Sequence, residues 1–237
     1  MDAWAKKEES YWPSISDLMS GLMLVFLFIA IAYMRNVEEG QKRIKKVAVA
    51  YQETQVSLYN SLMDEFKGDL PRWKARIDKD TLSVQFMEPD VLFQTGSAEV
   101  TNQFKTILDD FFPRYLQVLF SHEYQDCIEE IRIEGHTSSE WGNGDVAHEK
   151  AYFHNMRLSQ DRTRSVLRYC FGLAANEEQK GKMEKYVTAN GLSSSRLVKD
   201  EQGCELKRFS RRVEFRTRTN AEQKIVEIVE QLNNEIP

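Results

Sequence analysis

The sequence predicts an α/β (α+β) domain whose mixed sheet is covered by helices, preceded by a single transmembrane helix and a helical connector. Three observations support this fold class. An apolar run from Ile15 to Met34 contains a single ionisable residue, which is typical of a membrane span. A polar stretch with helical periodicity follows it. Beyond that stretch, short alternating segments rich in β-formers are separated by longer helical ones, which indicates one sheet packed against helices.

Length, charge and cysteine count limit the classes of protein to which this chain can belong. The chain has 237 residues and a formal net charge of −5. Without the membrane segment and its flank, roughly 160 residues remain, enough for one ordinary domain. The negative charge argues against nucleic-acid binding, and the sequence has no phosphate loop, zinc-ligand spacing or Gly-x-Ser-x-Gly elbow. Three widely separated cysteines leave one disulfide between two of them open: Cys127, Cys170 and Cys204.

The run at 14–34 predicts a transmembrane helix. About 20 residues in a helix span about 30 Å, the thickness of a bilayer's apolar core, and Pro13 suits the first helical turn. The alternative is a cleaved signal peptide, with the basic pair at 6–7 and a small-residue site at 30–32. The acidic pair at 8–9 dilutes the basic region, and the apolar run continues past that site. We therefore favour an uncleaved span.

The charges that flank this span and the motifs of the domain that follows it predict opposite orientations in the membrane. The C-terminal flank carries more basic residues than the N-terminal flank, namely Arg35, Lys42, Arg43, Lys45 and Lys46 against Lys6 and Lys7. The positive-inside rule would then place the C-terminal side in the cytoplasm. The motifs of the large domain, described below, favour the periplasm and outweigh that count.

Asp17 is the ionisable residue within the run, and it is a functional candidate. A carboxylate near one end of a membrane helix costs a few kcal/mol unless it is paired or protonated. Ser20 and Gly21 lie on the same helix face, where the hydroxyl can hydrogen-bond and the glycine permits close helix approach. The alternative is an interfacial Asp17 that acts as a helix-start residue near the dipole.

The segment 35–70 predicts a helical connector. Its apolar stripe has helical spacing but is broken, so that two copies could pair along it. The stripe consists of Ile44, Val47 or Ala48, Tyr51, Leu58, Leu62 and Phe66. Gly68-Asp69-Leu70-Pro71 ends the helix and marks the start of a domain at 71–237.

The first half of the domain predicts a strand followed by a helix. Residues 81–86 alternate and are rich in β-formers. A loop with Phe93 tucked inward follows. Residues 100–120 predict a helix with Thr101 as its N-cap, and Pro113 would kink or split it.

The middle of the domain predicts a second strand at 128–134 and a long turn at 136–145. Two helices follow, at 147–172 and 176–190, and Gly191 ends the second one.

The end of the domain predicts a short strand at 195–198, a stronger strand at 212–216 and an amphipathic tail helix at 220–235. The apolar face of this tail consists of Ile225, Ile228, Val229 and Leu232.

Four motifs stand together in this domain. They are Leu92-Phe93-Gln94-Thr95-Gly96-Ser97-Ala98-Glu99-Val100-Thr101, Ile133-Glu134-Gly135-His136-Thr137, Asn155-Met156-Arg157-Leu158-Ser159-Gln160-Asp161-Arg162 and Ser210-Arg211-Arg212-Val213-Glu214-Phe215. In this order and spacing they resemble the OmpA C-terminal-like domain, the peptidoglycan-binding module also found in flagellar MotB. The resemblance covers roughly 80–218.

The resemblance implies a site for the free carboxylate of diaminopimelate in a peptide stem. An arginine near a helix start can hold a carboxylate bidentately beside the free N–H groups of the helix. The implied peptidoglycan-binding residues are Thr137, Ser138, His154, Asn155, Leu158, Arg162 and Arg212. Arg162 would hold the carboxylate, and its alternative is an ion pair with Asp161 or Asp145.

One position departs from the family pattern. The family has an aspartate after Gly-His-Thr that accepts a hydrogen bond from the ligand's ammonium, whereas this chain has Ser138. Ser139, Glu140 or Asp145 could compensate. No metal is expected, because neither His136 nor His154 has an acidic or cysteine partner at ligand spacing in the sequence.

The span with Asp17, followed by such a domain, resembles the MotB-type stator subunits of ion-driven motors. In that family a homodimer sits inside a ring of MotA-like subunits, and the aspartate near the cytoplasmic start of the span is protonated and released in turn. The resemblance assigns this ion-conducting role to Asp17, with Ser20 beside it. It implies no cofactor beyond the translocated H⁺ or Na⁺, and one carboxylate with one nearby hydroxyl favours H⁺.

Within this class, the short head, the compact connector, the run at 16–23 and the Gly-His-Thr-Ser-Ser turn at 135–139 resemble the MotB-like subunit of the Zorya anti-phage defence system. The resemblance implies an inner-membrane complex of five MotA-like and two MotB-like chains, anchored to peptidoglycan. Residues 1–13 would be a cytoplasmic head and the domain at 71–237 would be periplasmic.

Three alternatives stand beside this reading. The chain could be a flagellar-type MotB stator subunit, or a passive peptidoglycan-anchored envelope scaffold whose span only tethers the domain. An enzyme acting on peptidoglycan would need paired carboxylates or a nucleophile with its base, and neither is found near the implied site. We therefore expect a membrane protein that is not an enzyme.

Overall fold

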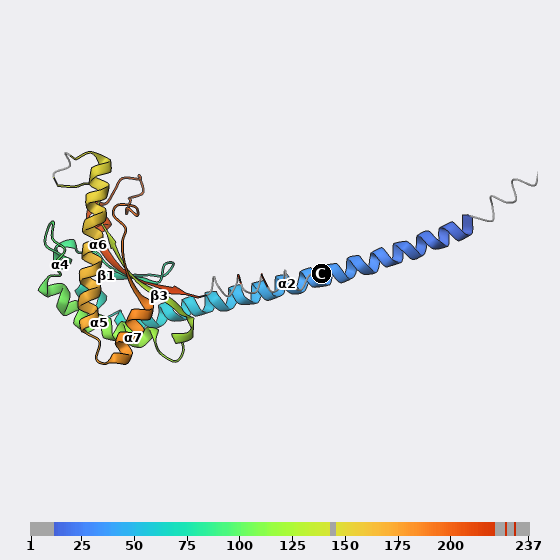
Figure 1. The fold of residues 1–237 in the computed structure, drawn as a ribbon, viewed down its shortest axis with the longest axis horizontal. Helices are drawn as coiled ribbons and strands as arrows, with labels where there is room; N and C mark the ends of the chain where they lie inside the picture. The colour runs from blue at the N-terminus through green and yellow to red at the C-terminus, as the bar shows by residue number, and fades with distance from the viewer. Residues whose placement is uncertain (1–11, 143–145, 221–225, 227–229, 231–237) are drawn as a thin grey trace, which may run out of the picture. The chain divides into compact units, whose positions relative to one another are not determined.

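Five strands form one mixed sheet, and helices pack on one of its faces (Figure 1). The computed structural model describes residues 12–142 and 146–220, together with residues 226 and 230. It divides into a unit at 51–222 and a second unit at 1–50 and 223–237. The helices and strands are α2 (Trp12–Phe66), α3 (Leu70–Trp73), β1 (Ala75–Asp78), β2 (Ser83–Phe86), α4 (Pro89–Leu92), α5 (Asn102–Leu119), η1 (Gln125–Cys127), β3 (Ile128–His136), α6 (His148–Gly172), α7 (Glu177–Tyr186), β4 (Val187–Gly191), α8 (Lys207–Ser210) and β5 (Arg212–Thr219).

The strand order is β1-β2-β5-β3-β4. Neighbouring strands are antiparallel except β3 and β4, which run parallel. A parallel pair requires a long crossover, and α6 and α7 supply it between these two strands. The predicted fold class, a mixed sheet covered by helices, is confirmed.

The helix-covered face of the sheet is apolar, and we call it the apolar face. Val84, Phe215 and Ile133 are register partners across three strands on this side, and each is 0% exposed. Phe111 of α5 meets the rings of Phe86 and Phe215 edge-on, with centroid distances of 5.2 and 5.1 Å. Such edge-to-face pairs add to the stabilisation from area burial, so this face holds the centre of the core.

The opposite face of the sheet carries polar side chains, and we call it the polar face. One row of register partners crosses all five strands: Arg76, Gln85, Glu214, Glu134 and Asn190. Glu134 and Glu214 are only 1% and 4% exposed. Buried carboxylates require partners, and this face supplies arginines for them, as described below.

The end of α2 belongs to the folded domain. Leu58, Leu62 and Phe66 are each 0% exposed and join the apolar core. On the same helix, the hydroxyls of Ser57 and Ser61 lie 2.7 and 2.9 Å from the hydroxyl of Tyr124. The unit that holds the sheet therefore starts at residue 51, within the segment that the sequence predicts as a connector.

The other unit contains the apolar part of α2. Among the described residues, this is the one helix that is long and apolar enough to cross a membrane, judged by length and composition. Its large side chains are exposed, for example Leu18 and Phe26 at 75% and 62%. The predicted tail helix at 220–235 lies almost wholly outside the described residues.

Three details of the secondary structure differ from the predictions. The region 187–191 is strand β4, not helix, because it pairs with β3 from Ile131 opposite Val187 onward. Strand β1 was not predicted, since four residues are too short to show an alternation. No strand forms at 195–198; an isolated bridge joins Lys199 and Glu205 instead.

Helix α5 continues through Pro113 without a split, and Thr101 caps it by accepting a hydrogen bond from the N–H of Phe104.

Candidate functional site

A cleft of about 340 Å³ opens beside the first half of α6. Its walls come from four segments that are far apart in the sequence: α4 with the loop after it, the loop after β3, α6, and the region around α8. The lining residues are Pro89, Asp90, Phe93, Thr95, Gly96, Thr137, Ser138, Glu140, Trp141, Gly142, Asn155, Leu158, Arg162, Lys207 and Arg211. Five of the seven predicted peptidoglycan-binding residues are among them.

Asn155 joins α6 to the loop after β3. Its side chain is 3% exposed, and its Nδ2 donates to the carbonyl oxygens of Ser138 and Glu140 at 3.1 and 3.0 Å. Two hydrogen bonds from one buried amide fix the loop against the helix. Asn155 therefore shapes the cleft wall as well as lining it.

Thr137 and Ser138 lie at the end of β3 and are both nearly buried, with exposures of 3% and 8%. The N–H of Thr137 donates to the carbonyl of Ser193 at 2.9 Å, so the backbone is held. The Oγ1 atom of Thr137 is buried and has no hydrogen-bond partner among the described residues. An unpartnered buried hydroxyl is costly, and a ligand in the cleft could supply the missing partner.

Arg162 reaches the cleft from the middle of α6. Its Nε donates to the carbonyl of Ser97 at 2.9 Å, and its guanidinium lies 4.8 Å from the ring centroid of Phe93. Burial lowers the pKa of Arg162 to about 10, and the positive charge of Arg211 contributes. The group remains protonated near neutral pH, so the cleft holds a half-buried positive charge.

The alternative ion pair for Arg162 is not found among the described residues. Asp161 instead pairs with Arg164 at 2.8 Å on the outer side of the helix. Asp145 lies outside the described residues. The described partners of the Arg162 guanidinium are backbone carbonyls, which do not neutralise its charge.

The height of α6 above the sheet depends on two glycines that are register partners, Gly135 and Gly191. A Cβ atom at Gly135 would lie 2.7 Å from Cγ2 of Thr163, and one at Gly191 would lie 2.3 Å from the backbone nitrogen of Gln160. Both distances are shorter than any relaxed contact. The helix that carries Asn155 therefore lies as close to β3 and β4 as it does because each strand has a glycine at this point, Gly135 next to the end of β3 and Gly191 at the end of β4.

Arg212, a predicted site residue, lies outside the cleft lining. Its side chain is 8% exposed, its Nε donates to Oε1 of Glu214 at 2.6 Å, and its Nη1 donates to the carbonyls of Arg196 and Ser210 at 3.1 and 3.2 Å. These contacts engage Arg212 in the polar face of the sheet. They also tie the end of α8, at Ser210, to the segment around Arg196.

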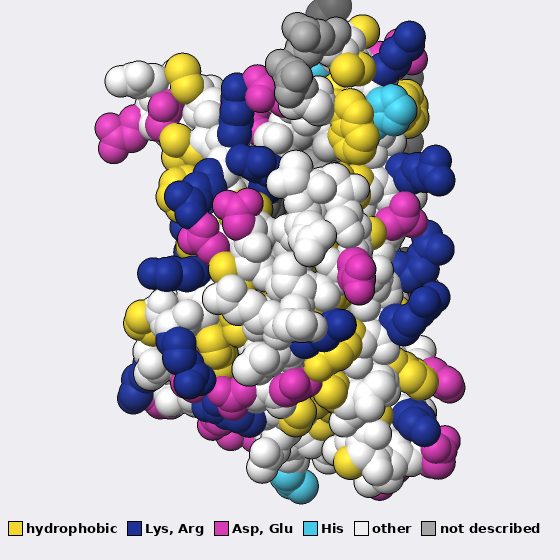
Figure 2. Space-filling model, turned by 90° about the vertical axis from the view of Figure 1, so that its left-hand side faces the viewer, with side chains coloured by type: hydrophobic (Ala, Val, Ile, Leu, Met, Phe, Trp, Pro, Cys, Tyr) yellow, Lys and Arg dark blue, Asp and Glu magenta, His cyan; other side chains and the backbone are white. Residues whose placement is uncertain are grey.

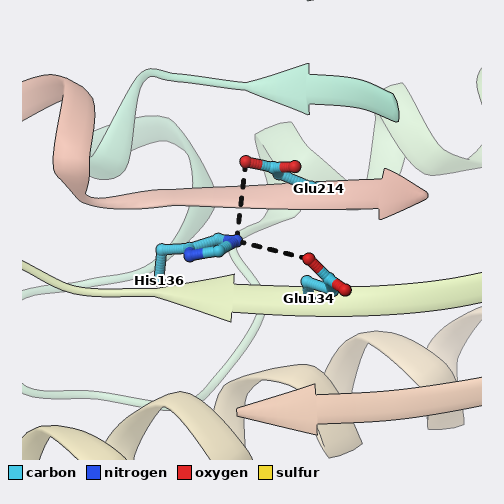
Figure 3. A group of neighbouring side chains, drawn as sticks. All are labelled: Glu134, His136 and Glu214. Atoms are coloured by element: carbon cyan, nitrogen blue, oxygen red, sulfur yellow. Dashed lines mark ion pairs between the residues drawn. The ribbon is translucent and has the colours of Figure 1, made fainter. Parts of the chain in front are cut away.

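Glu134, His136 and Glu214 form a buried cluster (Figure 3), and Arg212 donates to Glu214 of this cluster. The expectation that His136 has no acidic partner is wrong, because strand pairing places two carboxylates beside it. The Nε2 atom of His136 is 3.8 Å from Glu134 and 3.5 Å from Glu214. The three possible ligand atoms lie within 4.8 Å of one another.

This cluster is better explained as a charge network than as a metal centre. Arg196 donates to Glu134 at 3.1 Å and Arg212 donates to Glu214 at 2.6 Å, so arginines already compensate both carboxylates. A divalent cation would add charge to a buried site with surplus arginines. Burial, together with Arg212, Arg196 and Arg216, lowers the pKa of His136 to about 2. The imidazole is therefore neutral.

His154 and Leu158, the remaining predicted residues, take different positions. Leu158 lines the cleft. His154 is exposed and stacks against Trp141, with ring centroids 5.0 Å apart and an interplanar angle of 23°. It therefore supports the cleft through Trp141.

The lining residues that the sequence did not predict include Trp141, Lys207 and Arg211. Lys207 forms an ion pair with Glu140, and the neighbouring Ser139 donates its backbone N–H to Glu205 at 3.1 Å. The loop after β3 is therefore bound to the α8 region. The motif that contains Arg211 was recognised, but which of its two arginines faces the cleft depends on the strand register.

Charged side chains of both signs are interspersed on the face of the molecule seen in Figure 2, with Lys and Arg gathered along one edge. Arg157 and Arg164 on α6 both pair with Asp161 between them, at 3.9 and 2.8 Å. The exposed arginines of this helix therefore differ from Arg162, which has no carboxylate partner among the described residues.

Asp17 and Ser20, the predicted ion-conducting residues, lie near the start of α2, in the other unit. The hydroxyl of Ser20 donates to the carbonyl of Ser16 at 2.8 Å. This back-bond is common for a helical serine, and it leaves the hydroxyl oxygen able to accept a hydrogen bond.

Comparison with known proteins places the chain among close relatives, although no family model matches it. It is 48% identical over 225 residues to the Zorya protein ZorB of Escherichia coli strain Crooks, which covers 95% of this chain and 94% of that protein. It is 24% identical over 221 residues to the Zorya protein ZorB of Escherichia coli O139:H28, covering 88% and 80%. A MotB-like protein from Desulfovibrio vulgaris of known structure is 21% identical, covers 73% of this chain and 94% of that one, and has a TM-score of 0.47.

The first of these matches extends over nearly the full length of both chains. The resemblance to the MotB-like subunit of Zorya, inferred from a few motifs, is thereby confirmed. The chain belongs to the ZorB family of Zorya proteins.

Proposed function

We propose that this chain is the MotB-like membrane subunit of a Zorya-type anti-phage complex, driven by ion flow and anchored to peptidoglycan. The observation that carries the proposal is the 48% identity to a ZorB protein over 95% of the chain. In this proposal the chain crosses the inner membrane once, with residues 1–13 in the cytoplasm and the folded domain in the periplasm. It acts without enzymatic activity, resident cofactor or bound nucleic acid.

The partners follow from the same proposal. Two copies of the chain form a homodimer inside a ring of MotA-like subunits, in a five-to-two complex. The helix α2 supports this arrangement, because its apolar part leaves large side chains exposed on all sides in a single chain and needs lipid or other helices around it. The span and its partners then form the path of the ion.

Asp17 is the proposed ion carrier, and the proposed ion is H⁺. A single carboxylate within an apolar helix is expensive to retain unless it functions. Ser20, one turn further along, offers an oxygen that can accept a hydrogen bond from a protonated Asp17.

The cleft supports the proposed wall anchoring. It combines an uncompensated arginine, a buried hydroxyl without a described partner and backbone held by Asn155. These groups suit a carboxylate-bearing peptide, since a guanidinium binds a carboxylate through two parallel hydrogen bonds. The peptide stem of peptidoglycan has this chemistry.

The motor role is tested by Asp17→Asn in cells that carry the complete defence locus. The substitution keeps size and helix propensity but removes the exchangeable proton. We expect loss of phage protection with unchanged membrane levels of the chain and unchanged recovery of the MotA-like partner in pull-downs. The matched control is Ser10→Ala in the N-terminal head, which should keep protection. Full protection by Asp17→Asn would refute ion relay and favour a passive anchor.

The anchoring role is tested separately by co-sedimentation of the detergent-solubilised chain with purified sacculi. Arg162→Ala should reduce the bound fraction about tenfold or more, because a charge-assisted bidentate contact is lost. Arg164→Ala, on the same helix but paired with Asp161, is the matched control and should bind as the parent does. Equal binding by both variants would show that the cleft does not bind peptidoglycan.

A further inference from the structure

Two arginines face the same cleft, and neither has a carboxylate partner among the described residues. Arg162 donates from α6 to the carbonyls of Ser97 and Gln94. Arg211, at the end of α8, donates its Nε to the carbonyl of Lys207 at 3.3 Å. Both residues line the cleft. Each guanidinium has further N–H groups with no described partner.

The other charges of the lining do not neutralise this pair. Glu140 is already engaged by Lys207, which leaves Asp90 as the remaining acidic lining residue. The lining thus holds three cationic side chains against two acidic ones. The mutual repulsion of Arg162 and Arg211 also contributes to the lowered pKa of Arg162. Like charges held together in this way favour an anionic ligand.

We propose that Arg211 is a second carboxylate-binding residue of the cleft, so that the site selects a peptide with two free carboxylates, one for each guanidinium. The proposal deepens the wall anchoring described above and rests on it. Arg162 holds one carboxylate from the α6 wall. Arg211 holds the other from the α8 region. Thr137 and Ser138, which follow β3 and line the same cleft, serve neutral groups of the peptide.

The position of Arg211 makes it a specificity-determining residue rather than a structural one. Its side chain is exposed, whereas the adjacent Arg212 is buried and paired with Glu214. Successive residues at the start of a strand point to opposite sides. Removing Arg211 therefore leaves the buried network around Arg212 intact. The expected effect of removing Arg211 is a change in ligand preference.

The experiment measures binding of two synthetic peptides to the full-length chain in detergent by titration calorimetry. One is alanyl-γ-glutamyl-diaminopimelate with its carboxylates free. The other is the same peptide with the glutamyl α-carboxylate converted to a carboxamide. We expect the parent chain to bind the free peptide about tenfold more tightly than the amide, as one charge-assisted contact predicts. Arg211→Ala should bind both peptides equally, at the level of the amide.

Two further variants make the test sharp. Arg211→Lys keeps the charge without the planar fork, so it should recover part of the preference. Arg164→Ala, an exposed arginine outside the cleft, should keep the full preference. If Arg211→Ala still prefers the free peptide tenfold, the second contact is refuted.

The outcome for Arg162→Ala separates this inference from the function on which it rests. If Arg162→Ala loses binding while Arg211→Ala keeps its preference, the cleft remains the wall-binding site and Arg211 has no part in it. If Arg162→Ala binds both peptides as the parent does, the cleft is not the binding site and the proposed anchoring fails as well.

Discussion

The two faces of the sheet are built from the same alternating strands but do different work. The apolar face packs α5 through aromatic rings around Phe111 and Phe215, and it packs α6 through Val166 and Cys170. The polar face buries Glu134 and Glu214 with arginines that also hold the backbone of neighbouring segments. One face excludes water and stabilises the domain. The other orders the segments that form the cleft. Stability and site geometry can therefore be altered separately in this domain.

The largest effect is expected on the apolar face. Phe111→Ala removes a fully buried ring that contacts four other aromatic side chains besides Tyr115. It should lower the free energy of unfolding by about 3–5 kcal/mol, measured by urea titration of the detergent-solubilised chain with tryptophan fluorescence. Phe111→Leu, which keeps most of the volume, should cost less. A loss below about 1 kcal/mol for the alanine variant would contradict the comparison.

The next effect tests the polar face. Glu214→Ala leaves Arg212 buried without its carboxylate, which should cost about 3 kcal/mol or more. It should also weaken sacculus binding, because Arg212 holds the carbonyls of Arg196 and Ser210 near α8. The double variant Arg212→Met with Glu214→Met should recover stability but not binding. If the double variant recovers both, the polar face contributes no geometry to the cleft.

A smaller effect is expected where the two roles meet, beneath α6. Gly191→Ala places a Cβ against Gln160 and should cost about 1–3 kcal/mol by overpacking. Because the helix must lift, peptide binding should weaken more than stability alone explains. Gly181→Ala is the matched control, since nothing lies near its Cβ position, and it should be neutral or slightly stabilising. Equal behaviour of the two variants would show that α6 is not held by close contact.

The smallest effect concerns pH. His136 is held neutral in the folded state, with its pKa lowered from 6.5 to about 2. Above about pH 6.5 it is neutral in both states and contributes no slope; as pH falls below that value, the unfolded chain takes up a proton that the folded chain does not, so stability declines. His136→Gln should flatten the change in unfolding free energy between pH 7.5 and pH 5. The same slope in the parent chain and in His136→Gln would refute the assignment.

Much of the fold could be predicted because its signals are local. The apolar run, the alternation around Ile131 and Ile133, and the N-cap at Thr101 each depend on a few neighbouring residues. Strand β4 could not be predicted in this way, since 187–191 continues the helical pattern of α7 and becomes a strand by pairing with β3. Pairing with β3 therefore decides the secondary structure of 187–191.

The candidate site was predictable to the same extent. Asn155, Leu158 and Arg162 share one helix face, so a single motif identified all three. Arg211 and Arg212 are neighbours, and the sequence does not say which of them points into the cleft. That choice depends on the register of β5 against β3, which joins Arg212 to His136. The acidic neighbours of His136 could not be predicted for the same reason.

The paired glycines beneath α6 have a consequence for how this site can vary. Gly135 and Gly191 stand side by side at the ends of two parallel strands, and together they act as a spacer of fixed thickness between sheet and helix. A single methyl group at either position would push α6 away from the strand beneath it and would move Arg162, which α6 carries, relative to the rest of the cleft lining. The missing Cβ atoms of these two glycines thus set the distance between α6 and the sheet. A substitution at either glycine would change the size of the ligand that the cleft accepts without altering any residue that contacts the ligand.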